Sequence, residues 1–172
     1  GLTAELLDSR LNMEVDYFIR NTENAIIPVS LLLQAGEIDK NVGGIRNSGI
    51  EVALNWSDKI SDDLTYSVGV NLATLKNEVT DLYGQEYLNA GSAEFRQRSE
   101  VGHPLFSFYG YETAGVYQNQ AEIDADPIAV DNGLVPGDLK FKDQNGDNII
   151  DDEDKTYLGS YFPDLTYGGS IG

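Results

Sequence analysis

The sequence predicts an all-β protein whose antiparallel strands belong to a transmembrane β-barrel, of which this chain would form a fragment. Three observations lead to this fold class. Apolar and polar side chains alternate with a period of two residues, as they do in strands with one apolar and one polar face. The alternating runs are about nine to eleven residues long, whereas strands of soluble domains usually have about five or six. Short and long connections also alternate along the chain, which is typical of outer-membrane barrels.

The first two predicted strands cover residues 10–20 and 47–57. In the first, one face carries Leu11, Met13, Val15, Tyr17 and Ile19, and the other carries Asn12, Glu14 and Asp16. In the second, Ile50, Val52, Leu54 and Trp56 alternate with Glu51, Ala53, Asn55 and Ser57. Tyr17 and Trp56 stand near strand ends, where barrels place girdles of aromatic residues. Aromatic residues of a soluble core would show the same pattern.

The other two predicted strands cover residues 64–76 and 163–172. In the first, Leu64, Tyr66, Val68, Val70 and Leu72 alternate with Thr65, Ser67, Gly69, Asn71 and Ala73. The tail repeats the pattern more weakly, through Leu165, Tyr167 and Ile171. The small, uncharged residues of the polar face suit the wall of a barrel lumen.

The connections decide how these strands would be oriented. Residues 58–63 predict a short turn, and residues 21–46 and 77–162 predict long loops on the opposite side of the membrane. Strands 10–20 and 64–76 would then run outward, and the other two would run inward. Periodicity alone leaves a soluble β-domain equally open, because an antiparallel sheet with one solvated face alternates in the same way.

Residues 77–162 are too many for a structureless loop, since such loops rarely exceed about 15 residues. The segment holds seven of the ten tyrosines and predicts further strands at 108–118 and 138–143. We therefore expect a folded extracellular excursion with its own small core, between barrel residues 1–76 and the start of another strand at 163–172. Aromatic side chains displayed for ligand stacking are the alternative.

Composition excludes several classes of function. The net charge of −18 argues against nucleic acid or an anionic lipid surface as a partner. The chain has no cysteine, so neither disulfides nor thiol chemistry are available. His103 is the single histidine and precedes a proline in a turn-like stretch, so no catalytic triad can be built around it. The sequence therefore predicts no enzymatic activity and no catalytic residue.

The stretch DQNGDNIIDDED, residues 143–154, carries oxygen-bearing groups at the spacing of a calcium loop. With Asp143 as position one, the expected ligands are Asp143, Asn145, Asp147, the carbonyl of Ile149, Asp151 and Asp154. Six to eight such oxygens satisfy Ca²⁺, so we expect a structural calcium ion here. The alternative is a solvated acidic turn, in which repulsion among the aspartates would remain uncompensated.

Two features distinguish this loop from the helix–loop–helix form of the EF-hand. Position six is Asn148 instead of glycine, although asparagine tolerates the left-handed backbone better than most residues. Position twelve is aspartate instead of glutamate, as in the dockerin-type variant. A strand is expected before the loop, and about one helical turn, capped by Asp151, is expected after it.

The sequences of several segments resemble those of a known protein family. Four segments are similar to the late barrel region of SusC/RagA-type TonB-linked outer-membrane proteins of the Bacteroidota. They are PGDLKFKDQNGDNIIDDEDKTYLGS followed by FPDLTYGG, the upstream GHPLFSFYGYETAGVYQ, and NVGGIRNSGIEVALNW. The resemblance covers nearly the whole chain, and residues 136–164 are its most specific part. It implies an outer-membrane location, with the loop region facing outward and the calcium loop at Asp143–Asp154 retained.

The resemblance also implies a function. Proteins of this type import oligosaccharides or peptides through a plugged barrel, with energy supplied by TonB and a SusD-like surface lipoprotein covering the barrel. The chain would be a fragment of such an importer, without the plug and without enough strands to close the barrel. A secreted, calcium-stabilised β-module that binds carbohydrate or a partner protein is the second hypothesis. A calcium-dependent enzyme domain is the third.

Overall fold

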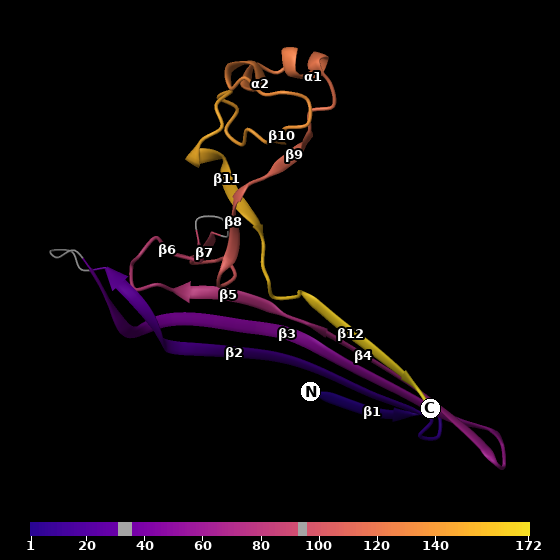
Figure 1. The fold of residues 1–172 in the computed structure, drawn as a ribbon. Coiled ribbons are helices and arrows are strands. Elements are labelled where there is room, and N and C mark those ends of the chain that lie inside the picture. Colours follow the sequence, from indigo (N-terminus) through magenta and orange to yellow (C-terminus); the bar gives the residue numbers. More distant parts are fainter. Residues whose placement is uncertain (31–35, 93–95) are drawn as a thin grey trace. The chain divides into compact units, whose positions relative to one another are not determined.

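The computed structural model describes residues 1–30, 36–92 and 96–172 (Figure 1). Of the described residues, 61% are in strands and 8% in helices, so the predicted all-β class is confirmed as mostly antiparallel β-structure. The described strands do not close into a barrel. The chain divides into two compact units. The first unit consists of Gly1–Leu88, Ser99–Leu105 and Ser160–Gly172, and the second consists of Asn89–Arg98 and Phe106–Gly159.

The first unit contains a six-stranded antiparallel sheet. Its order is β1-β2-β3-β4-β12, and β5 pairs with β3 past the end of β4. The strands are β1 (Leu2–Leu6), β2 (Leu11–Ser30), β3 (Glu37–Ser61), β4 (Leu64–Thr74), β5 (Lys76–Asp81) and β12 (Leu165–Ile171). Figure 1 shows β2, β3 and β4 as long neighbouring strands. All four strands predicted from the alternation are present.

Strands β2 and β3 are longer than predicted, at 20 and 25 residues. The prediction of a long loop at 21–46 is wrong for the described residues of that stretch, because pairing continues from Asn21 opposite Arg46 to Ser30 opposite Glu37. Residues 31–35 lie outside the described residues. The predicted short turn at 58–63 is confirmed and is tighter than expected, since only Asp62 and Asp63 separate β3 from β4.

A small core stabilises the extended part of the β2–β3 pair. Ile27 and Val29 of β2 are buried together with Val79 of β5 and Leu82, which follows it. Partly buried Val42, Leu88 and Leu105 pack against this cluster. Burial of alternate residues on one strand face explains why this hairpin continues as strand, even though its sequence is rich in polar residues.

Strand β3 changes its neighbour near Gly49. Residues from Glu51 onward pair with β4, whereas Ser48 pairs with Lys76 of β5. At the change, the amide of Ile50 donates to the Thr74 hydroxyl oxygen at 3.0 Å. A Cβ atom placed on Gly49 would lie 2.0 Å from the Thr74 carbonyl oxygen. Only glycine therefore lets the two backbones approach this closely.

The second unit is built from short elements. It holds most of a four-stranded sheet with the order β11-β8-β7-β6 and a two-stranded ribbon of β9 and β10. The elements are β6 (Tyr87–Ala90), β7 (Gln97–Glu100), β8 (Ser107–Tyr111), β9 (Thr113–Val116), α1 (Gln120–Asp124), α2 (Pro127–Asp131), β10 (Leu139–Phe141), a 3₁₀ turn (Asp152–Asp154) and β11 (Lys155–Gly159).

The strands predicted at 108–118 and 138–143 are confirmed as β8, β9 and β10. The second unit begins later than the predicted excursion at 77–162, because β5 is a strand of the first unit's sheet. Helices α1 and α2 were not predicted. Asn119 and Asp126 cap their first turns, and Tyr117, Ile123 and Ala129 form the unit's buried apolar cluster.

Candidate functional site, a two-faced sheet and an acidic loop

The register of the sheet separates apolar and polar residues into complete rows across five strands. One row consists of Leu2, Val15, Val52, Leu72 and Tyr167, and the next consists of Thr3, Glu14, Ala53, Asn71 and Gly168. The following apolar row consists of Ala4, Met13, Leu54, Val70 and Gly169. Because side chains that face each other across strands lie on the same side of a sheet, one face is apolar throughout this region and the other is polar.

The apolar face is uncovered by the described residues. Val70 is 51% exposed, Tyr17 65%, Tyr167 82% and Ile171 87%. Soluble monomers rarely expose contiguous apolar patches of more than a few hundred Å², and a soluble sandwich would bury this face against a second sheet. The exposed face therefore disfavours a soluble β-module and requires an apolar environment.

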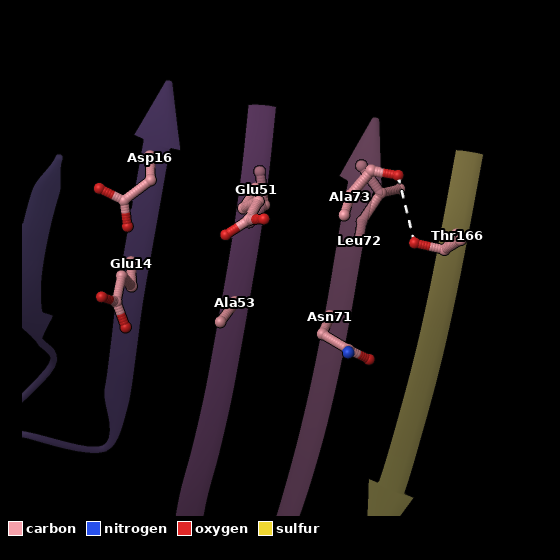
Figure 2. Close-up of a pocket in the computed structure, with 9 residues that line it drawn as sticks. Glu14, Asp16, Glu51, Ala53, Asn71, Leu72, Ala73 and Thr166 are labelled. Atoms are coloured by element: carbon pink, nitrogen blue, oxygen red, sulfur yellow. Dashed lines mark hydrogen bonds between the residues drawn. The ribbon is translucent and has the colours of Figure 1, made fainter. Parts of the chain in front are cut away.

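The polar face carries a shallow hollow of about 350 Å³, shown in Figure 2. Glu14 and Asp16 on β2, Glu51 on β3, Asn71 on β4 and Thr166 on β12 line it. Asp16 and Glu51 stand directly opposite each other, an arrangement of like charges that is unfavourable unless water or a counter-charge screens it. This face is suited to an aqueous environment.

In the acidic loop, side-chain oxygens accept hydrogen bonds from backbone amides and so determine the path of the backbone. Asp143 accepts hydrogen bonds from the amides of Gly146 and Asn148, at 2.6 and 2.8 Å. Asn145 accepts from the amide of Asp147 at 3.0 Å, and Asp147 accepts from the amide of Ile149 at 2.8 Å. Asn148 has φ of +66°, so position six adopts the left-handed backbone that asparagine tolerates.

The end of the loop matches the predicted helical turn. Asp151 caps the 3₁₀ turn by accepting from the amide of Glu153 at 2.8 Å. Asp154 is fully buried and accepts from the amides of Asp151 and Gln144, both at 2.8 Å. These two hydrogen bonds, the one from Asp151 first, hold the pKa of the Asp154 carboxyl below its usual value. Its contribution to stability is therefore present above the ordinary aspartate pKa and is lost as the pH falls through the lowered value.

The six predicted ligands all belong to the loop of residues 143–154, and their oxygen donors fit a hard cation. Each carboxylate oxygen has more than one lone pair, so an oxygen that accepts an amide hydrogen can still bind a metal. Within residues 1–30, 36–92 and 96–172, no group of three or more His, Cys, Asp or Glu side chains is already arranged to hold a metal ion. Calcium binding would require the carboxylates to turn inward, and it stays a prediction.

No helix in the described part of the chain is long and apolar enough to cross a membrane.

Several known proteins are similar to this chain in sequence. No protein-family profile matches the sequence. A TonB-dependent receptor of Formosa agariphila, P26, is 31% identical over 174 residues, which cover 98% of this chain and 17% of that receptor. SusC of Bacteroides thetaiotaomicron, also a TonB-dependent receptor, is 28% identical over 169 residues, 90% of this chain and 15% of SusC. This chain is homologous to a segment of TonB-dependent receptors.

This chain spans less than a fifth of the length of these relatives. The fold agrees with solved structures. It matches a chain of the RagAB peptide importer in its 'open-open' state with a TM-score of 0.75 at 22% identity, covering 98% of this segment and 18% of that chain. A structure of the RagAB peptide transporter matches with a TM-score of 0.71 at 21% identity. The predicted SusC/RagA-type resemblance is confirmed.

The chain also contains a partly buried polar network that the sequence did not reveal. The Tyr117 hydroxyl donates to Asp126 at 2.8 Å, and the Lys140 ammonium lies 2.7 Å from the same carboxylate oxygen. Asp126 caps α2 through the amide of Ile128. Burial of the ring, followed by the Asp126 carboxylate, raises the pKa of Tyr117 to about 12. The network ties β9, α2 and β10 together.

Replacing Tyr117 with phenylalanine should lower the free energy of unfolding by about 1 kcal/mol at neutral pH, the usual contribution of one hydrogen bond. Because the folded pKa is raised, the contribution of Tyr117 is complete below pH 10 and is lost as the pH rises to about 12. The difference in tyrosinate absorbance between the parent protein and the variant should therefore show one group that titrates near pH 12. A difference centred near pH 10 would contradict the network.

Proposed function

We propose that this chain forms part of the wall of a TonB-dependent outer-membrane importer for oligosaccharides or peptides. The main observation that supports this proposal is the two-faced sheet, in which long antiparallel strands have one exposed apolar face and one polar face. In a membrane barrel, the apolar face contacts lipid and the polar face lines the interior. Homology to TonB-dependent receptors supports the same conclusion.

The second unit would face the cell exterior. The two-residue turn between β3 and β4 closes one end of the sheet, and outer-membrane barrels have their short turns on the periplasmic side. The chain leaves the sheet after β5 and re-enters it at β12, and most of the residues between these strands belong to the second unit. We assign to this unit the contact with a SusD-like lipoprotein or with incoming ligand. The similarity to SusC and to RagAB supports this assignment, and TonB would engage other parts of the longer protein.

In this function the calcium ion is structural. Asp143, Asn145, Asp147, the Ile149 carbonyl, Asp151 and Asp154 would hold it and stiffen the loop between β10 and β11. If its affinity is that of extracellular modules, about 10⁻⁴ to 10⁻³ M, millimolar calcium adds about 0.4 to 1.4 kcal/mol. That is enough to order a loop of the second unit.

Combining Asp143→Ala with Asp147→Ala should abolish the rise in melting temperature that millimolar calcium gives the parent protein. A matched control combines Asp124→Ala with Asp131→Ala, which removes the same charge from α1 and α2 in the same unit. The control should keep the calcium response. The calcium assignment fails if calorimetry detects no calcium binding to the parent protein, or if both double variants respond alike.

The importing function is tested in the bacterium that carries the full-length protein. Deleting its gene should abolish growth on the oligosaccharides or on the peptides that it imports, when these are the only nutrient supplied. Restoring the gene should restore growth, but only in cells with functional TonB. Unchanged uptake of both classes of nutrient after deletion would overturn the proposal.

A further inference from the structure

Toward the short turn, the apolar face carries an aromatic pair and an ion pair. At that end Trp56 of β3 and Tyr66 of β4 lie on the apolar face, and the Trp56 indole nitrogen donates to the Tyr66 hydroxyl oxygen at 3.0 Å. Asp58, which stands directly opposite Tyr66, forms an ion pair with Arg10 at 3.3 Å. Tryptophan and tyrosine prefer the interface between hydrocarbon and water, because each has an apolar ring and a polar tip.

The same face has its other end where β3 pairs with β5. Asn21, Arg46 and Glu78 form a row across β2, β3 and β5. The Arg46 Nε donates to the Asn21 Oδ1 at 3.0 Å, and Lys76, one row nearer the apolar band, forms an ion pair with Glu78 at 2.9 Å. Charged groups of this kind are costly inside hydrocarbon and are stable at the level of the lipid headgroups.

On the basis of the proposed function, we infer that the Trp56–Tyr66 pair and the Asn21–Arg46–Glu78 row mark the two surfaces of the hydrocarbon layer. The lipid bilayer is therefore the partner of the face between the Trp56–Tyr66 pair and the Asn21–Arg46–Glu78 row. The inner surface lies at the aromatic pair, and the outer surface lies at the charged row.

The distance between the aromatic pair and the charged row agrees with this assignment. Trp56 and Arg46 are ten residues apart on β3, which corresponds to roughly 33 Å along a strand. With a strand tilt of about 40°, the height across the membrane is about 25 Å, the usual height of the apolar band on outer-membrane barrels. On β2, the residues of this face between the two limits are apolar, namely Met13, Val15, Tyr17 and Ile19. The row of Ile19 also holds Ser48 and Lys76, and the Lys76 ammonium reaches outward to Glu78 of the charged row.

The boundaries are testable by spin-label scanning of the full-length protein in lipid bilayers. Single cysteines would replace Leu72 at the centre of the band, Leu64 beyond the aromatic pair and Asn21 at the charged row. Asn71, which neighbours Leu72 on the opposite face, is the matched control. Collisions of the nitroxide with oxygen report lipid, and collisions with a water-soluble nickel chelate report the aqueous phase.

Leu72 should show high oxygen and low nickel accessibility, whereas Leu64 and Asn21 should show the reverse. Asn71 should show no preference for lipid. If Leu72 reports lipid but Leu64 or Asn21 does as well, the boundaries are overturned and the membrane wall stands. If Leu72 is as accessible to nickel as Leu64, the wall itself is wrong, and the proposed function fails with it.

Discussion

Replacing Leu72 with arginine should destabilise the assembled protein by about 2 to 4 kcal/mol, the cost of a basic side chain at the midplane of a membrane barrel. Leu72 lies in the middle of the apolar band, in the row with Val15 and Val52. The arginine would have to leave water or draw water and headgroups into the hydrocarbon layer. The measurement is the temperature at which the folded form loses its altered gel mobility, compared with the parent protein.

Asn71→Arg is the matched control, because Asn71 adjoins Leu72 and lines the hollow of the polar face. Its arginine would remain in water and would stand near Glu14 and Glu51, two other residues of the same hollow. The control should therefore change stability by less than about 1 kcal/mol. Equal effects of the two substitutions, or a larger effect of Asn71→Arg, would show that the apolar face does not contact lipid.

Replacing Gly49 with alanine should cost about 1 to 3 kcal/mol, the usual penalty for overpacking. The added Cβ would lie 2.0 Å from the Thr74 carbonyl oxygen and 2.9 Å from the Phe18 ring. The ring can turn away, but the carbonyl belongs to the backbone at the point where β3 exchanges β4 for β5. The pairing there must shift, and the folded fraction should fall in a thermal melt.

Gly169→Ala provides the control for the Gly49 substitution. Gly169 lies in β12 of the same sheet, and its Cβ would meet only the Gly69 carbonyl oxygen at 3.4 Å. We expect a change within about 0.5 kcal/mol, as for substitutions outside special sites. If both alanine variants melt like the parent protein, the close approach at Gly49 is absent in solution.

The sequence predicted the two faces correctly because a period of two residues is a direct consequence of strand geometry. The prediction of a loop failed for the extension of β2, where the register shifts between Thr22 and Ala25 and again before Ile26. A bulge adds a residue without a partner and breaks the period, so the polar run around Asn24 looked like a loop. Backbone pairing holds that run in the sheet, and side-chain alternation does not report it.

The acidic loop was predictable because its contacts are local. Asp143, Asp147 and Asp151 accept from amides two to five residues away, so the spacing of residues determines the fold of the turn, including the cap at Asp151. The network of Tyr117, Asp126 and Lys140 joins three elements that are apart in sequence. The charged row at Arg46 likewise depends on the pairing of β3 with β5. No periodic pattern predicts such contacts.

We propose that the apolar face of this sheet lies against membrane lipid, and fractionation of cells carrying the full-length protein tests this contact most directly. We predict that the protein stays with the outer membrane through washes with high salt and urea. It should need detergent for release and should change its gel mobility when heated. Recovery as a monomer in plain buffer, without detergent, would contradict the account.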